Sequence, residues 1–206
     1  MAEPHLSSGA AEALARLLPV LGCGEEAASL AFESLAKIGH LASDGRRALR
    51  QVAIEERVHD GLIHSLAANL PAPPEDRELR SIARRFHLDL GRSDPTALLA
   101  RIAALDSAVC LVLSRLLRPG TPLSGDPAVT AVLRRIAEDE ARHVRVTRRL
   151  AMARADEREL QRIAAPVRER LGALLTLAGD AFETLAFDPR WLRDDIARFP
   201  AGLFRQ

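Results

Sequence analysis

The chain has 206 residues, 48% of them hydrophobic, and a formal net charge of +1. This length and composition suit one globular domain with a substantial core, and they argue against a disordered chain. A charge so close to zero argues against a nucleic-acid-binding protein or a polybasic membrane-binding protein, since both carry a clear basic excess.

The cysteine and tyrosine contents exclude several kinds of redox site. Cys23 and Cys110 are the only cysteines and lie far apart in the sequence, which excludes a thiolate zinc site or a rubredoxin-type iron centre. The absence of tyrosine excludes a mechanism that stores a tyrosyl radical. The first residues lack a basic region ahead of an apolar run, and we find no apolar stretch that looks long enough to span a bilayer. We therefore expect a cytoplasmic protein that does not bind membranes.

Apolar residues recur at spacings of three and four along nearly the whole chain, which predicts an all-α fold. Pro19 and the glycines at 22 and 24 indicate a break after a short first helix. Ser43 or Asp44 is expected to cap a later helix, and Pro166 to kink another. The helices are expected over about residues 10–18, 25–38, 43–70, 76–90, 95–118, 127–154, 157–185 and 189–200.

The lengths of the connections indicate how these helices are arranged. Short loops join 25–38 to 43–70 and 95–118 to 127–154, whereas about 25 residues separate the two pairs. Two antiparallel hairpins joined by one long crossover form the ferritin-like type of four-helix bundle. We predict one domain over residues 1–206, with the bundle core at about 24–154, a helical crossover, and extra C-terminal helices at about 156–200.

Two Glu-x-x-His pairs stand out within the predicted bundle. Glu56 and His59 lie within about 60° of each other on one helix and share its apolar stripe. Glu140 and His143 repeat this pattern, and the segments 53–59 and 137–143 resemble each other. A buried, unpaired carboxylate is costly, so two of them beside histidines call for compensating positive charge, which a pair of metal ions supplies.

Each hairpin should contribute one further carboxylate. Asp106 lies at the centre of an apolar stripe. Residue 123, in the loop between the two helices, is the sequence midpoint between Asp106 and Glu140, so antiparallel helices joined by this loop place the two residues at the same height in the bundle. The corresponding partner of Glu56 should lie near residues 26–30. Glu25 is preferred because its face is apolar; Glu26 is the main alternative, and Glu33 fits this height poorly.

These residues together resemble the ferritin-like diiron-carboxylate superfamily over roughly residues 24–154. The segment 139–143, Asp-Glu-Ala-Arg-His, is also similar to a signature of the hydroxylase components of bacterial multicomponent monooxygenases. The resemblance implies that Glu25 and Asp106 bind terminally, that Glu56 and Glu140 bridge two metals, and that His59 and His143 each bind one. Asp106 departs from the family pattern, in which Glu is commoner at this position.

Supporting carboxylates are expected beside the histidines. Glu55 and Asp139 are candidates to orient the histidine of the opposite helix, and Arg142 to pair with one of them. Asp180 and Glu183, in the predicted C-terminal extension, are weaker candidates for an additional ligand or a pocket wall.

We hypothesise a di-iron or iron–manganese oxidase or oxygenase that uses O₂ or peroxide to oxidise a small molecule. Such an enzyme would need an external electron donor, and the chain could form a homodimer. A ferroxidase or peroxide-scavenging protein without cage storage is the alternative. A metal-free helical interaction protein with a vestigial site is a third hypothesis.

Overall fold

The computed structural model describes residues 4–38, 41–73, 76–198 and 202–205. Within these residues all regular secondary structure is helical, which confirms the all-α prediction. The helices are α1 (Ser8–Leu35), α2 (Ser43–Ala67), α3 (Arg77–Gly91), α4 (Pro95–Leu116), α5 (Pro127–Met152), α6 (Glu157–Thr176), α7 (Gly179–Thr184) and α8 (Pro189–Arg198).

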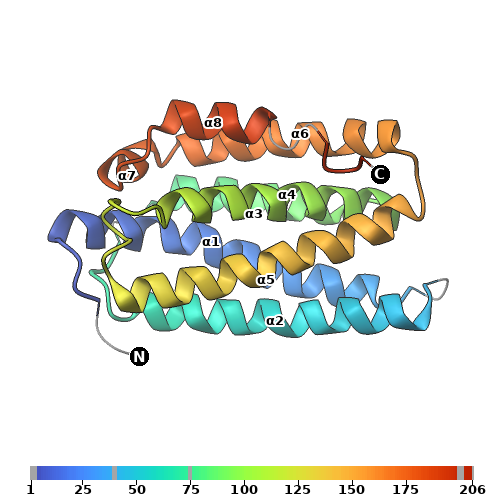
Figure 1. Ribbon diagram of the computed structural model, residues 1–206, viewed down its shortest axis with the longest axis horizontal. Coiled ribbons are helices and arrows are strands. Elements are labelled where there is room, and N and C mark those ends of the chain that lie inside the picture. The colour runs from blue at the N-terminus through green and yellow to red at the C-terminus, as the bar shows by residue number, and fades with distance from the viewer. Residues whose placement is uncertain (1–3, 39–40, 74–75, 199–201, 206) are drawn as a thin grey trace.

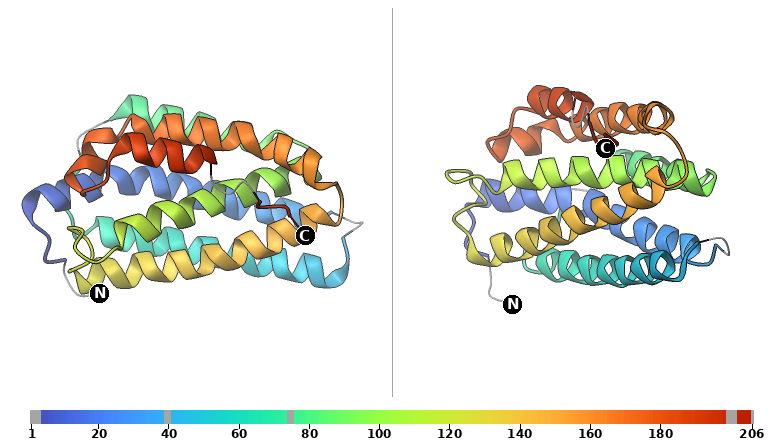
Figure 2. Two further views of the ribbon diagram at one scale, coloured as in Figure 1. Left: turned by 45° about the horizontal axis from the view of Figure 1, so that its top comes forward. Right: turned by 45° about the vertical axis from the view of Figure 1, so that its right-hand side comes forward.

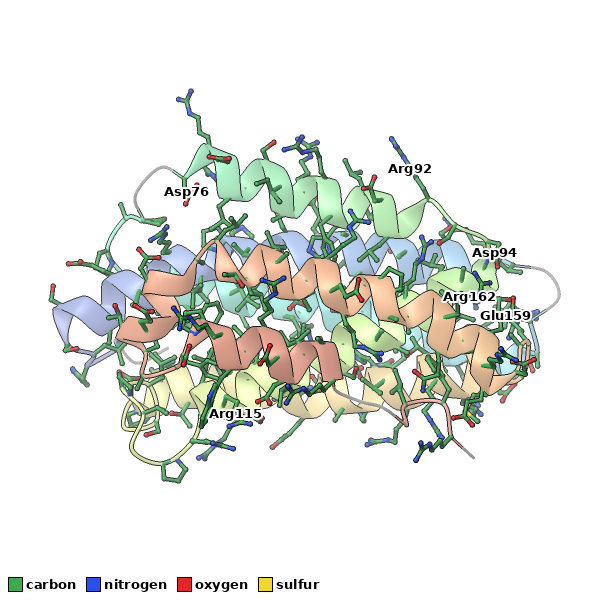
Figure 3. All side chains as sticks on the ribbon, turned by 90° about the horizontal axis from the view of Figure 1, so that it is seen from above. Asp76, Arg92, Asp94, Arg115, Glu159 and Arg162 are labelled. Atoms are coloured by element: carbon green, nitrogen blue, oxygen red, sulfur yellow. The ribbon has the colours of Figure 1, made fainter. Side chains whose placement is uncertain are left out.

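Two long helical hairpins form the body of the molecule. The helices α1 and α2 run antiparallel to each other, as do α4 and α5, and these two pairs share the most extensive contacts in the structure (Figure 1). The hairpins meet along α2 and α5. Between them in the sequence, α3 packs mainly on α1 and runs along one edge of the molecule from Asp76 to Arg92 (Figure 3).

The C-terminal helices add a layer to the second hairpin. The helices α6 and α8 pack against each other and on α4, on the side away from α2 (Figures 1 and 2). Arg115 of α4 ties this layer down with an ion pair to Asp195 of α8, whose N–O distance is 2.5 Å. The layer therefore covers the face of α4 that the hairpin partner α5 leaves free.

Aspartate residues set the start of four helices, because each accepts hydrogen bonds from free backbone N–H groups of the first turn. Asp76 accepts from Leu79, and Asp94 from Thr96 and Ala97. Asp126 and Asp156 cap α5 and α6 in the same way. The predicted starts of α3, α4, α5 and α6 are confirmed to within one residue.

The predicted break near Pro19 is wrong, because α1 is one continuous helix of 28 residues. Proline removes one backbone donor from a helix and strains the preceding turn. Here Leu18 and Val20 on either side of it are buried in the core. Packing of α1 against α2, α3 and α7 therefore outweighs the weak local preference to break.

Other predicted boundaries also differ from the structure. The residue that precedes α2 is Ala42, and it makes no side-chain cap, so neither Ser43 nor Asp44 has the predicted role. The predicted helix at 157–185 is divided into α6 and α7, whereas Pro166 lies inside α6. The chain turns there because α8 packs back on α6, and Gly179 lies against Pro189. The predicted end of α8 near residue 200 lies outside the described residues.

One helix corrects the expectation that no apolar stretch is long enough to span a bilayer. By length and composition alone, the 22 residues of α4 would suffice. In the structure 72% of its most apolar stretch is buried inside the protein, as in the core helix of a bundle.

Replacement of Pro19 by alanine tests the continuity of α1. The substitution restores a backbone donor inside the helix, so we expect the free energy of unfolding to rise by about 1–3 kcal/mol in urea denaturation. Pro122, in the turn between α4 and α5, is the matched control. Alanine at this position gives the unfolded chain more conformational freedom, so we expect the free energy of unfolding to fall by about 0.5 kcal/mol. A fall for Pro19→Ala would mean that α1 is broken at this residue.

Candidate metal centre

Four buried side chains from three helices form a group that can hold a metal ion. They are Glu25 of α1, Glu56 and His59 of α2, and Glu140 of α5. One potential ligand atom from each residue lies within 4.8 Å of those of the other three. Each side chain reaches the interior because it lies in the apolar stripe of its helix, and the side chain of His59 is fully buried.

His59 directs its Nδ1 atom at three carboxylates. The distances from Nδ1 are 3.2 Å to Glu25 Oε2, 3.5 Å to Glu140 Oε1 and 3.6 Å to Glu56 Oε2. Only Glu56 lies on the same helix as His59. The group therefore joins both hairpins, with α1 and α2 on one side and α5 on the other.

His143 occupies the equivalent position on α5. Its Nδ1 atom lies 2.9 Å from Glu56 Oε1 and 3.7 Å from Glu140 Oε1, and its side chain is fully buried. The rings of His59 and His143 lie 5.6 Å apart between centroids. Glu56 and Glu140 thus both lie between the two histidines, in the position that a pair of bridging carboxylates would occupy.

Asp106 of α4 is buried beside this group, although it is not one of the four residues that lie within 4.8 Å of one another. Nδ1 of His143 faces Glu56 and Glu140, and the Oδ2 atom of Asp106 has no hydrogen-bond partner among the described residues. Buried polar atoms are rarely left in this way. These two atoms, beside Glu56 and Glu140, have the chemistry of a second set of cation ligands.

The far side of each imidazole is held by a carboxylate from the opposite hairpin. His59 Nε2 lies 3.1 Å from Asp139 Oδ2, and His143 Nε2 lies 2.9 Å from Glu55 Oε2. An Nε2–H that donates to a carboxylate leaves Nδ1 as the ring nitrogen that can bind a cation. The contacts that we predicted for Glu55 and Asp139 are present.

Arg142 connects these two supporting carboxylates. Its guanidinium forms an ion pair with Asp139 and lies 3.2 Å from Glu55 Oε1, so it pairs with both carboxylates and not with one as predicted. Arg135 adds a second contact to Asp139 at 2.8 Å. Both carboxyl groups have lowered pKa values, because their hydrogen bonds outweigh the effect of burial. Glu55 accepts from Gln51, His143 and Arg142, and Asp139 accepts from His59, Arg142 and Arg135.

The carboxyl groups at the centre of the site differ in their acidity. Burial, together with the nearby Glu56 and Glu140, raises the pKa of Glu25 and of Asp106 well above the ordinary range. Burial also acts to raise the pKa of Glu56, but hydrogen bonds with His143 and His59 lower it to about 2. Glu56, which contacts both histidines, is therefore ionised, whereas Glu25 and Asp106 favour the protonated form.

Both histidines have raised pKa values. Burial lowers the pKa of an imidazole, yet hydrogen bonds with Glu140, Glu25 and Glu56 raise the pKa of His59 to about 12. Hydrogen bonds with Glu140 and Glu56 raise that of His143 to about 11. In the absence of a cation both rings would therefore carry a second proton, which a metal ion at Nδ1 would displace.

The structure separates the alternative ligands from the site. Glu26 is exposed on α1, and Glu33 forms an ion pair with Arg57 at the surface. Asp180 pairs with Arg16, and Glu183 is exposed. Of the carboxylates considered for the first helix, Glu25 is the one that joins the buried group.

The carboxylates line one side of an apolar cavity, whose walls include side chains of the crossover helix α3 and of the C-terminal helices α6 and α7. It lies between α1, α4 and α6, and its polar lining consists of Glu25, Glu56, Asp106, Glu140 and His87. Burial lowers the pKa of His87 to about 4, so this imidazole is uncharged at neutral pH. The lining residues of the cavity could not be named from the sequence, because they depend on how α6 docks.

No family model matches this chain, and no curated protein sequence matches it.

Substitution of the supporting carboxylates should weaken metal binding without removing a ligand. We expect Asp139→Asn and Glu55→Gln each to lower the affinity for Mn²⁺ about 10- to 100-fold, because the histidine then loses its charged acceptor. Glu138→Gln is the control, since the Glu138 side chain is exposed next to Asp139. Isothermal titration calorimetry gives the affinities, and equal affinities for Asp139→Asn and Glu138→Gln would contradict the role of Asp139.

Metal affinity should rise with pH. The free site holds protons on His59 and His143 with pKa values of about 12 and 11, so between pH 6 and pH 9 both must leave when Nδ1 binds metal. We expect log K for Mn²⁺ to increase with a slope of at least two per pH unit, because Glu25 and Asp106, whose pKa values are raised, release further protons wherever they are protonated in the free site. Calorimetry in buffers of different ionisation enthalpy counts the released protons. Affinity that is independent of pH would show that the histidines are not ligands.

Proposed function

We propose that this chain is a non-haem two-metal oxidase or oxygenase, built on a ferritin-like bundle, that oxidises a small molecule. The observation that carries the proposal is the paired arrangement of the histidines. Each directs Nδ1 at the shared carboxylates while its Nε2 contacts a carboxylate of the other hairpin. A single structural ion would need only one such arrangement.

The residues fit two ions in the following way. Glu25 and His59 would hold one ion, Asp106 and His143 would hold the other, and Glu56 and Glu140 would be shared. Oxygen and nitrogen donors of this kind suit iron or manganese. Two such ions, when bound, would supply redox electrons to O₂ or peroxide, and an external donor would restore them.

The protein side chains would provide geometry and a dry environment. Asp139, Glu55 and Arg142 would hold both imidazoles in one orientation and in one tautomer. The aliphatic wall of the neighbouring cavity would keep bulk water from the carboxylates. The two hairpins and the crossing helix α3 support the ferritin-like assignment, because this topology brings one carboxylate from each helix to the same level.

The cavity also favours an organic substrate over iron itself. A ferroxidase needs a polar route along which hydrated Fe²⁺ can reach the site, whereas this cavity is lined almost entirely by aliphatic side chains. The same donors could serve a ferroxidase or a peroxide-scavenging protein, so oxygen consumption must distinguish these functions.

Anaerobic titration with Fe²⁺ tests the proposal. We expect the wild-type chain to bind two ions, and His59→Ala to bind at most one. His64→Ala is the matched control, because His64 lies on the same helix but is exposed and contacts Asp60. Fewer than one ion per wild-type chain would contradict the two-metal site.

Oxygen consumption by the loaded protein then separates the reactions. With ascorbate as reductant and no further iron, uptake that increases when an organic substrate is added is the result expected of an oxidase or oxygenase. Uptake that occurs only with each new addition of Fe²⁺ would instead indicate a ferroxidase.

A further inference from the structure

The apolar cavity meets the candidate metal centre on one side only. Its lining includes the four central carboxylates, Glu25, Glu56, Asp106 and Glu140, but neither His59 nor His143. The histidines and their supporting network of Glu55, Asp139 and Arg142 therefore close the opposite side. Any molecule that approaches the carboxylates through the protein interior does so from this cavity.

The rest of the lining is almost wholly aliphatic. Among the residues that form it are Leu17, Leu21 and Ala28 of α1, Val109 and Val112 of α4, and Leu174 of α6. Apart from the carboxylates, His87 is the one lining side chain in the described part of the protein that can form hydrogen bonds. No lysine or arginine of the described residues lines the cavity.

This lining restricts the charge of the ligand. An anion would lie beside four carboxylates with no arginine or lysine to compensate it. A molecule with several polar groups would leave most of them against aliphatic side chains, without hydrogen-bond partners. The carboxylates of Glu25, Glu56 and Glu140 are already paired with the two histidines on their far side, so a cation is not needed in the cavity. The lining therefore favours an uncharged molecule whose single polar group faces the carboxylates or His87.

The size of the cavity restricts the ligand further. About 80 Å³ is accessible to the centre of a water molecule. At roughly 10–15 Å³ per water-sized group, this space holds on the order of six heavy atoms. A space of this size with aliphatic walls, mainly from α1, α4 and α6, suits a short hydrocarbon chain or a small ring.

We propose that this cavity binds an uncharged aliphatic molecule of roughly six heavy atoms, with its single polar group toward the carboxylates. The inference rests on the proposed function, because it identifies this class of molecule as the substrate. Its physical content, selective binding of short uncharged hydrocarbons, does not require the metals.

A series of straight-chain alcohols tests the cavity directly. We expect 1-butanol, 1-pentanol and 1-hexanol to bind the full chain with affinities that rise about fourfold per methylene, the gain for a buried CH₂ group. From 1-hexanol to 1-octanol the increase should stop, because the cavity is full. Hexane-1,6-diol should bind at least tenfold more weakly than 1-hexanol, since its second hydroxyl would meet aliphatic side chains. Ligand-detected NMR gives these affinities.

Cavity-filling variants locate the binding. Val109→Phe adds bulk to the wall from α4 and Ala28→Leu to the wall from α1, and each should weaken 1-hexanol binding at least tenfold. Val58→Phe makes the same change as Val109→Phe on the exposed face of α2, and should leave binding unchanged. If Val109→Phe does not fold, as judged by circular dichroism, Ala28→Leu decides the question. Equal affinities for the filled variants and wild type would overturn the proposal.

The measurements are made with no metal added and after loading with redox-inert Zn²⁺, so that the two proposals can fail separately. Alcohol binding that follows the expected series in a protein that binds no metal would overturn the proposed function and leave the cavity assignment standing. Two bound metal ions without alcohol binding would overturn the cavity assignment alone. Affinity that keeps rising to 1-octanol, or diol binding equal to that of 1-hexanol, would also overturn it.

Discussion

The structure depends on the burial of four carboxylates and two imidazoles at one level between four helices. Glu25, Glu56, Asp106 and Glu140 are each no more than 6% exposed, and both histidines are fully buried. Repulsion among such groups would drive the hairpins apart unless positive charge stood between them. Either bound metal ions or additional protons on the histidines supply this positive charge. The nearby carboxylates favour the protonated imidazoles, which is why the pKa values of both histidines are strongly raised.

This constraint explains the features around the site. Each hairpin supplies two carboxylates to the centre of the site. Each also supplies a third carboxylate, which contacts the histidine of the other hairpin. Arg142 then links Glu55 with Asp139, so that the contact between α2 and α5 carries one continuous polar network. On the side of α1 and α4 the site meets aliphatic side chains instead. The same group of residues thus has one face held rigid by ion pairs and one face open to an apolar space.

Much of this could be predicted from helical periodicity. The phase of Glu56 and His59, and that of Glu140 and His143, follows from 100° per residue, and Glu55 and Asp139 follow from the same phase. The break predicted at Pro19 was wrong because packing outweighs a local preference, and the turn between α6 and α7 depends on α8. The cavity and the double pairing of Arg142 depend on how helices dock, which no local pattern encodes. Three statements stay predictions: that the site binds two iron ions, that the protein is an oxidase or oxygenase, and that the bundle is ferritin-like.

The central claim is that the carboxylates and histidines hold two metal ions. A crystal soaked with Mn²⁺ and measured at wavelengths that give anomalous signal from manganese tests it most directly. The account predicts two anomalous peaks about 3.5–4 Å apart, with Glu56 and Glu140 between them and Nδ1 of His59 and His143 each facing one peak. A single peak, or peaks away from these residues, would contradict it.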